Sequence, residues 1–269
     1  MPVPLALVQP LVMGIVNVTP DSFSDGGRFV EPAAAIAHGL ALVAEGADVV
    51  DVGGESSRPG ATPVDQVTEL ARVVPVVEAL AGRVRVSVDT VKAVVAHAAV
   101  DAGASLINDI SASLHEVAAE RRVGWVAMHM QGEPRTMQVD PCYRDVVAEV
   151  TTSCCTAATK ARAAGVEEVW IDPGIGFGKS AEHNWALLGA LGDLVATGWP
   201  VVVGTSRKAF LGRALAGADG TPGQVGAHDR LEGSVATAAW AAMQGVAMVR
   251  VHDVAATVAA RDALATVAA

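Results

Sequence analysis

The stretch VRVSVDTVKAVVAHAAVDAGASLI, residues 84–107, contains the unit that decides the fold. Its β-branched apolar run Val84–Val88 is typical of a strand buried on both faces. A helical pattern over Val91–Gly103 follows and ends at a glycine, and a second short strand is expected over Ser105–Ile107. Two strands joined through one helix predict a parallel β-α-β unit.

The same unit recurs along the whole chain. The apolar runs that predict strands are Leu11–Val16, Asp48–Val52, Val84–Val88, Ser105–Ile107, Trp125–Met128, Val169–Ile171, Pro200–Val203 and Ala247–Val251. The clearest helical patterns are Glu31–Gly46, Val64–Gly82, Val91–Gly103, Tyr143–Gly165, Ala181–Gly198, Leu231–Gly245 and Val254–Ala268. Eight strand–helix units in 269 residues predict an α/β protein with a (β/α)8 TIM barrel, a single domain over residues 1–269. A doubly wound open sheet is the competing fold, and the count of eight favours the barrel.

Composition excludes several classes of protein. No apolar run reaches the roughly 18 residues that a membrane span needs. The net charge of −10 argues against general binding to nucleic acid or to an anionic membrane, so an anionic ligand must meet a local group of cations. Cys142, Cys154 and Cys155 are odd in number and form no C-x-x-C, which predicts reduced thiols. Residues 1–10 carry no Lys or Arg, so we expect no secretory signal and a cytoplasmic protein.

Polar residues follow every predicted strand, and a barrel of this type places its chemistry at the carboxyl ends of its strands. They are Asn17, Asp51, Asp89, Asn108-Asp109, His129, Asp172, the Ser206-Arg207-Lys208 that follows Gly204, and Arg250 with His252. Each one alone reads equally well as a helix cap or a loop residue. Together they would converge at one mouth, which the segments Val18–Arg28 and Gly53–Pro63 flank.

The chemistry of these side chains divides in two. Asp89, Asn108 and Asp172 offer hydrogen-bond acceptors, which suit a flat heterocycle with amide and amino groups. Positive charge is expected from Arg58, Lys208, Arg250 and His252, and the last two share one face of a strand because they are two residues apart. Four cationic candidates on an acidic protein predict a phosphate or pyrophosphate ligand.

Other motifs fail. Gly174–Ser180 resembles a phosphate loop, but a Walker A pattern needs Gly where Pro173 stands, and its glycine spacing is not that of a dinucleotide-binding turn. The chain has neither H-E-x-x-H nor G-x-S-x-G, and no dense cluster of metal ligands. A metal, if present, is expected to be a hard ion such as Mg²⁺, brought by phosphates and touched by one side chain.

Eight stretches together resemble the bacterial dihydropteroate synthase family. They are MGIVNVTPDSFSDGG (13–27), DVGGESSRPG (51–60), SVDT (87–90), INDI (107–110), MHMQG (128–132), DPGIGFGK (172–179), GTSRK (204–208) and RVHD (250–253). They occur in order, one per strand end, and the first motif and the Ser-Arg-Lys motif are highly specific. Ser57 stands where many members have Thr, and the hydroxyl is kept.

The resemblance implies a reaction and a role for each residue. The family joins 6-hydroxymethyl-7,8-dihydropterin pyrophosphate to p-aminobenzoate in folate synthesis, releasing pyrophosphate. It implies pterin contacts from Asp89, Asn108, Asp172 and Lys208, with Met128 and Phe177 packed nearby. Pyrophosphate contacts are implied for Asn17, Arg58, Arg250 and His252, with Asn17 also at Mg²⁺. Ser57, Pro59, Ser206 and the loop Val18–Arg28 are implied at the p-aminobenzoate site, where sulfonamides compete. The implied catalytic set is Asn17, Arg58, Asp89, Lys208, Arg250 and His252, and a homodimer through an outer helix is implied too.

Two alternatives stay open at this point. A methyltransferase acting between methyltetrahydrofolate and a corrinoid would share the pterin contacts, but it needs no cluster of cations for pyrophosphate. A synthase-like paralogue, non-catalytic or drug-resistant, would bind pterins as well. A non-catalytic one should lack a motif residue, and none is missing.

Overall fold

The computed structural model describes residues 9–19, 32–58, 60–218, 223 and 225–268, and in them eight parallel strands form one sheet. The strands are β1 (Leu11–Asn17), β2 (Val49–Gly53), β3 (Arg85–Asp89), β4 (Leu106–Asp109), β5 (Gly124–Met128), β6 (Val169–Asp172), β7 (Val202–Val203) and β8 (Met248–Val251). Their order is β6-β5-β4-β3-β2-β1-β8-β7, so consecutive strands are neighbours and β1 pairs with β8. An isolated parallel bridge between Ile171 and Val201 brings β6 to β7. The predicted barrel is confirmed, and the doubly wound sheet is wrong.

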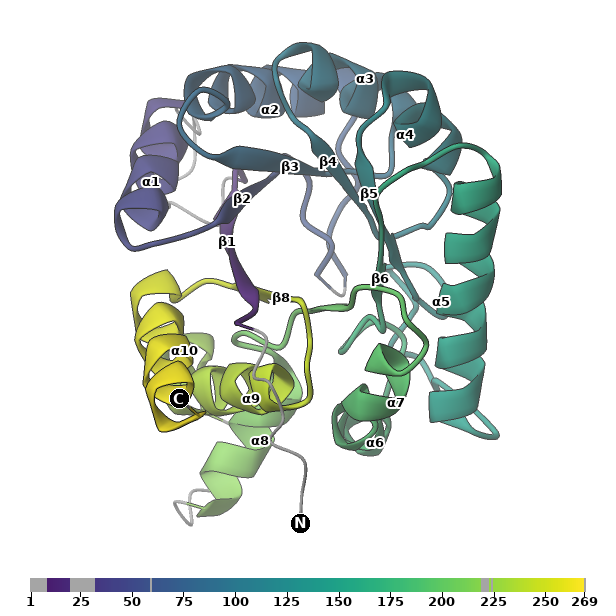
Figure 1. Cartoon of the computed structure of the whole chain (residues 1–269), viewed down its shortest axis with the longest axis vertical. Helices are drawn as coiled ribbons and strands as arrows, with labels where there is room; N and C mark the ends of the chain where they lie inside the picture. The colour runs from purple at the N-terminus through teal and green to yellow at the C-terminus, as the bar shows by residue number, and fades with distance from the viewer. Residues whose placement is uncertain (1–8, 20–31, 59, 219–222, 224, 269) are drawn as a thin grey trace.

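Helices surround the strands (Figure 1). They are α1 (Pro32–Ala44), α2 (Gln66–Leu80), α3 (Ala93–Asp101), α4 (His115–Arg121), α5 (Val146–Ala163), α6 (Ala181–Gly189), α7 (Leu191–Val195), α8 (Ala209–Ala218), the short 3-10 turn η2 (Ala227–Asp229), α9 (Leu231–Met243) and α10 (Val254–Ala268). In the part of the chain that the structure describes, none is long and apolar enough to cross a membrane.

The expected helix over Ala181–Gly198 is wrong in one respect, because the structure has two helices there, α6 and α7. The break falls at Ala190, whose backbone is not helical (φ −104°, ψ 17°). Close to it, the carbonyl of Leu188 accepts a hydrogen bond from the Trp240 indole at 2.8 Å, which ties this turn to α9. Two helices, α4 and α8, were not among those expected.

The strands are buried on both faces, as their apolar composition predicts. All five residues of β2 are buried. Outward-facing valines such as Val12, Val50 and Val88 belong to the large core between strands and helices. Inward-facing residues form a second, smaller apolar cluster inside the barrel.

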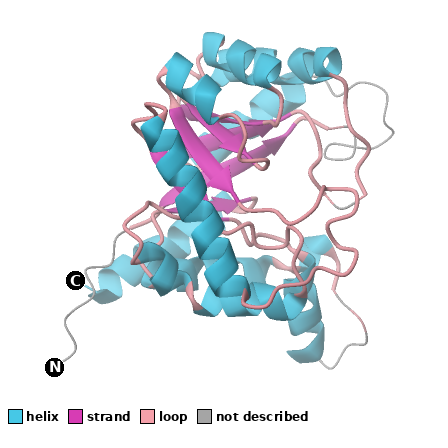
Figure 2. Cartoon of the chain, turned by 90° about the vertical axis from the view of Figure 1, so that its right-hand side faces the viewer, coloured by secondary structure: helices cyan, strands magenta, loops and turns pink. Residues whose placement is uncertain are grey.

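Near the amino-terminal end of the barrel, an ion pair links the first residue of β3 to the residue that precedes β6. The Arg85 guanidinium lies 2.6 Å from the Glu168 carboxylate, which also accepts a hydrogen bond from the Trp170 indole at 2.7 Å. The strand arrows in Figure 2 point toward the opposite side, where the long loops gather. The carboxyl ends of the strands therefore meet those loops, as the sequence predicts.

Candidate active site

The side chains that point into the barrel are apolar in one layer and mostly polar in the next layer, two residues further along each strand. Its apolar layer is made by Met13, Val49, Leu106, Val126, Trp170, Val202 and Met248. Side chains on one face of a strand recur at every second residue. The next inward positions above that layer are therefore Asp51, Asn108, Met128, Asp172 and Arg250. Asn17 and His252 follow two residues beyond Ile15 and Arg250. The alternation alone brings these residues into one mouth.

Register places four of the strand ends side by side. Asn17 pairs with Gly53, Gly53 with Asp89, and Asp89 with Asn108, across β1 to β4. Asp109, the neighbour of Asn108, has a different task. Its buried carboxylate accepts hydrogen bonds from the backbone N–H groups of Ser111, Ser113 and Leu114 and so holds the turn into α4.

Arg250 lies between two carboxylates. Its Nε donates to Asp51 Oδ2 at 2.6 Å and its Nη2 donates to Asp89 Oδ2 at 2.8 Å. Asp51 is fully buried and also accepts from Asn108 Nδ2 at 2.9 Å. Because the Asn108 amide nitrogen is taken, its oxygen remains as an acceptor. Burial raises the pKa of Asp89 to about 7, and Arg250 opposes that rise.

A second group forms at the ends of β6 and β7. The Lys208 ammonium donates to the Ile175 carbonyl and lies 4.7 Å from the centre of the Phe177 ring. Burial lowers the pKa of Lys208 to about 8, and the Asp172 carboxylate opposes the fall. Asp172 is itself buried, and its Oδ1 accepts from the Gly174 N–H at 2.7 Å. An acceptor, a cation and an aromatic ring thus lie together.

His252 and Ser206 form a third group. Ser206 Oγ accepts from the His252 backbone N–H at 3.1 Å and lies 3.0 Å from His252 Nδ1. Burial, together with Arg207 and Arg250, lowers the pKa of His252 to about 3, and Arg58 contributes in the same direction. The low pKa favours the neutral imidazole, which offers one N–H group in place of the expected positive charge.

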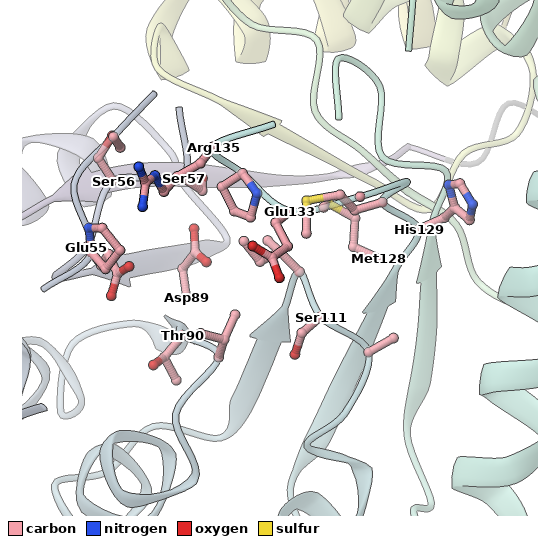
Figure 3. Close-up of a pocket in the computed structure, with 18 of the residues that line it drawn as sticks. Glu55, Ser56, Ser57, Asp89, Thr90, Ser111, Met128, His129, Glu133 and Arg135 are labelled. Atoms are coloured by element: carbon pink, nitrogen blue, oxygen red, sulfur yellow. The ribbon is translucent and has the colours of Figure 1, made fainter. Parts of the chain in front are cut away.

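A cavity of about 530 Å³ opens across the strand ends, with Ser57, Asp89 and Met128 in its wall (Figure 3). Glu133 and Arg135, from the loop after β5, also line it. Thr90 and Ser111 line it from the ends of β3 and β4. Asn108, Asp172, Lys208, Arg250 and His252 are not among its lining residues, so the cavity adjoins the three groups at Asp89 and Met128.

The structure thus brings most of the expected residues together. Contacts link Asp89, Asn108 and Arg250 in one group, Asp172, Phe177 and Lys208 in another, and Ser206 with His252 in the third. Arg58 is exposed. Pro59 lies outside the described residues, as do residues 20–28 of the expected loop Val18–Arg28.

For several polar residues near the site, the sequence predicted no function. Asp51 was noted only as a strand end, although a lone carboxylate inside an apolar strand signals a buried partner. Lys92 forms ion pairs with Glu55 and with the fully buried Glu69, which accepts from Thr90 Oγ1 at 2.6 Å. This group ties the loop after β2 to the turn after β3. Nothing in the local pattern distinguishes Glu69 from an ordinary acid in the first turn of a helix.

The fold and the site are those of a barrel enzyme whose mouth carries carboxylate and amide oxygens next to basic side chains, a set that suits a polar heterocycle. Comparison with known proteins narrows this class. Residues 13–252 match the model of a family described as pterin binding enzyme. The dihydropteroate synthase of Mycobacterium leprae is 51% identical, covering 98% of this chain and 94% of that protein.

Solved structures agree in fold and in sequence. The dihydropteroate synthase of Xanthomonas albilineans with 4-aminobenzoic acid has a TM-score of 0.89 and 46% identity, covering 98% of this chain and 94% of that one. The Yersinia pestis dihydropteroate synthase in a sulfonamide drug complex has a TM-score of 0.89 and 44% identity, covering 98% and 97%. The chain belongs to the dihydropteroate synthase family.

Proposed function

We propose that this chain joins 6-hydroxymethyl-7,8-dihydropterin pyrophosphate to p-aminobenzoate, giving 7,8-dihydropteroate and pyrophosphate. The observation that carries the proposal is the convergence of Asp89, Asn108 and Asp172 beside Lys208, above the apolar floor of the barrel. Family membership supports it, as does a cavity that reaches this group at Asp89 and Met128. Nothing in the described residues favours methyl transfer to a corrinoid, which has no use for the basic group at Arg58 and Arg250.

The pterin ring is expected at the carboxylates. Its guanidine-like edge carries N–H donors, which Asp172 and the free oxygen of Asn108 can accept. Met128 and Phe177 are placed to pack against a flat ring. Asp89 becomes available when its bond to the Arg250 guanidinium is exchanged for a pterin N–H, while Arg250 keeps Asp51 as its second partner.

The pyrophosphate is expected at the other end, between Arg58, Arg250 and the neutral N–H of His252. Breaking the bond from the pterin methylene carbon to oxygen leaves positive charge on the carbon and adds negative charge to pyrophosphate. The carboxylates of Asp89 and Asp172 stabilise the first, and the two guanidinium groups stabilise the second. The route is therefore dissociative, and the p-aminobenzoate nitrogen then attacks the carbon and loses a proton.

The p-aminobenzoate and any competing sulfonamide are placed beside the hydroxyls of Ser57 and Ser206, with Pro59 next to Ser57 in the chain. Ser57 lies in the cavity wall, and Ser206 contacts His252. The arylamine site therefore adjoins the pyrophosphate site, as attack on the methylene carbon requires. No protein nucleophile takes part, so positioning supplies most of the acceleration.

Magnesium fits the donors at this mouth. In the described part of the chain, no three His, Cys, Asp or Glu side chains gather closely enough to hold a metal ion. The protein offers the Asn17 amide oxygen, and Mg²⁺ favours sites in which substrate phosphates provide the remaining ligands. When bound, the ion would neutralise charge on the leaving pyrophosphate.

We also propose a cytoplasmic homodimer that associates through the face formed by α6 and α9. Trp185 on α6 is 42% exposed, and Leu231, Trp240 and Met243 on α9 are 39%, 41% and 44% exposed. The Trp240–Leu188 hydrogen bond holds the two helices together. The described cysteines are unpaired thiols, in keeping with a reducing compartment.

Sedimentation of the purified protein is expected to give twice the monomer mass of 27.3 kDa. Replacing Trp240 by Glu places a charge on that apolar face and is expected to shift the mass toward the monomer. A wild-type protein that sediments as a monomer at all concentrations contradicts the dimer.

Pyrophosphate release tests the proposed function. With pterin pyrophosphate, p-aminobenzoate and Mg²⁺, we expect steady release that a chelator slows greatly and that excess Mg²⁺ restores. Sulfamethoxazole is expected to block it, and release that persists indicates the same reaction in a site that excludes the drug. Folded protein that releases nothing overturns the function and leaves a pterin-binding paralogue.

Replacing Lys208 by Ala is expected to lower kcat/KM for the pterin substrate by more than about tenfold, the least that loss of a charge-assisted contact costs. Circular dichroism checks that the variant folds. A variant with the same kcat/KM as the wild type contradicts the proposed contact between Lys208 and the substrate.

Affinity for 6-hydroxymethylpterin is expected to fall as the pH drops below about 7. The reason is the raised pKa of Asp89, which is an ionised carboxylate, and so a strong acceptor, only above that pH. The loss approaches about tenfold per pH unit. His252 stays neutral throughout, because its pKa is about 3. Calorimetric titrations from about pH 5.5 to 8.5 measure the profile, and a flat profile contradicts the assignment of Asp89.

A further inference from the structure

Lys179 is a buried cation that has no part in the chemistry above. It is 2% exposed, and its Nζ lies 3.0 Å from His129 Nδ1, 3.2 Å from the His129 carbonyl oxygen and 2.9 Å from the Phe177 carbonyl oxygen. Burial lowers the pKa of Lys179 to about 7, and Asp172 opposes the fall. Three acceptors match the three N–H bonds of the ammonium form, whereas a neutral amine has two. An ammonium group accepts nothing, so His129 Nδ1 is the acceptor and the ring carries its proton on Nε2.

These contacts join two loops that are far apart in sequence. His129 follows β5, and Phe177 lies in the turn after β6. The two loops are in close van der Waals contact. A Cβ atom at Gly174 would lie 1.9 Å from the carbonyl oxygen of His129, and a Cβ atom at Gly178 would lie 2.3 Å from the carbonyl oxygen of Gln131. Both glycines have positive φ, at 65° and 62°. Tyr143 adds a hydrogen bond of 2.9 Å to the Gly178 carbonyl.

The turn that Lys179 holds carries the pterin end of the site. Asp172 begins it, the Ile175 carbonyl in its middle accepts from Lys208, and the Phe177 ring lies beneath the Lys208 ammonium. Burial raises the pKa of Asp172, and Lys208, Arg250 and Lys179 oppose that rise. In Figure 3, His129 lies at the far side of the group of lining residues from Asp89.

We propose that Lys179 is a positioning residue for the pterin end of the site: its buried ammonium fastens the turn of Asp172 and Phe177 to the loop after β5. It touches no substrate and acts through Asp172, Phe177 and Lys208. The inference rests on the proposed function. Loss of Lys179 is therefore expected to weaken the binding of the pterin and not that of pyrophosphate. The reason is that Arg58 and His252, at the proposed pyrophosphate site, do not depend on this turn.

The test compares two probes on one variant. Lys179→Met keeps the length of the side chain and removes its charge. We expect its affinity for 6-hydroxymethylpterin to fall at least tenfold, and its affinity for inorganic pyrophosphate with Mg²⁺ to change less than twofold. Burial and Lys179 lower the pKa of His129 to about 4. Because the variant lacks the Lys179 charge, the pKa of His129 measured by NMR titration is expected to rise.

Arg85→Met is the matched control, since it breaks an ion pair with Glu168 in the barrel but outside the site. It is expected to lower the melting temperature and to leave both affinities unchanged. If Lys179→Met does not fold, His129→Asn and His129→Leu replace it. Asn restores an acceptor near the position of Nδ1 and is expected to bind pterin like the wild type, whereas Leu is expected to bind it at least tenfold more weakly.

Two results overturn the inference. One is a Lys179→Met variant, or in its place a His129→Leu variant, that binds the pterin as tightly as the wild type. The other is an equal loss for pterin and pyrophosphate, which indicates general damage to the fold. Wild-type protein that binds no pterin contradicts the proposed function instead, so the two failures are distinguishable.

Discussion

The two-residue alternation of side chains along a nearly closed ring of parallel strands is the constraint on which this structure depends. It sends valines outward to the helices and sends every second residue inward. One layer inside the ring is apolar, from Met13 to Met248, and the layers above it carry the carboxylates, the amide and Arg250. A shift of one residue in any strand would exchange those two sets. The same pattern therefore specifies both the core and the site.

Opposite charges lie together at the mouth of the barrel although the whole chain carries −10. Arg250 pairs with Asp51 and Asp89, and Lys208 and Lys179 interact with Asp172. Buried pairs of this kind contribute little to stability, because desolvation offsets their attraction. Their concentration at one end of the barrel indicates function. In the proposed function, the substrate exchanges partners with Arg250 and Asp89, whose polar groups are already in place.

The sequence predicted the barrel because each β-α unit repeats the same local pattern. It predicted Asn108, Asp172, Arg250 and His252 as site candidates because the end of a strand is visible in sequence, and resemblance to a family supplied their roles. Other features depend on tertiary contacts. The neutrality of His252 follows from burial near two arginines, the break between α6 and α7 lies beside a contact with Trp240, and the partners of Lys179 are contributed by a different loop. No local pattern contains that information.

The ring is not equally strong all the way round. Seven neighbouring pairs of strands share continuous register, whereas β7 has two residues and meets β6 only through the bridge of Ile171 and Val201. The barrel therefore has a seam, and the turns that carry Phe177 and Lys208 lie directly above it. A ring with one weak joint deforms there first, because the other joints have more hydrogen bonds to break. We therefore expect thermal opening of the barrel to begin between β6 and β7, and a ligand that contacts both turns would hold these two strands together.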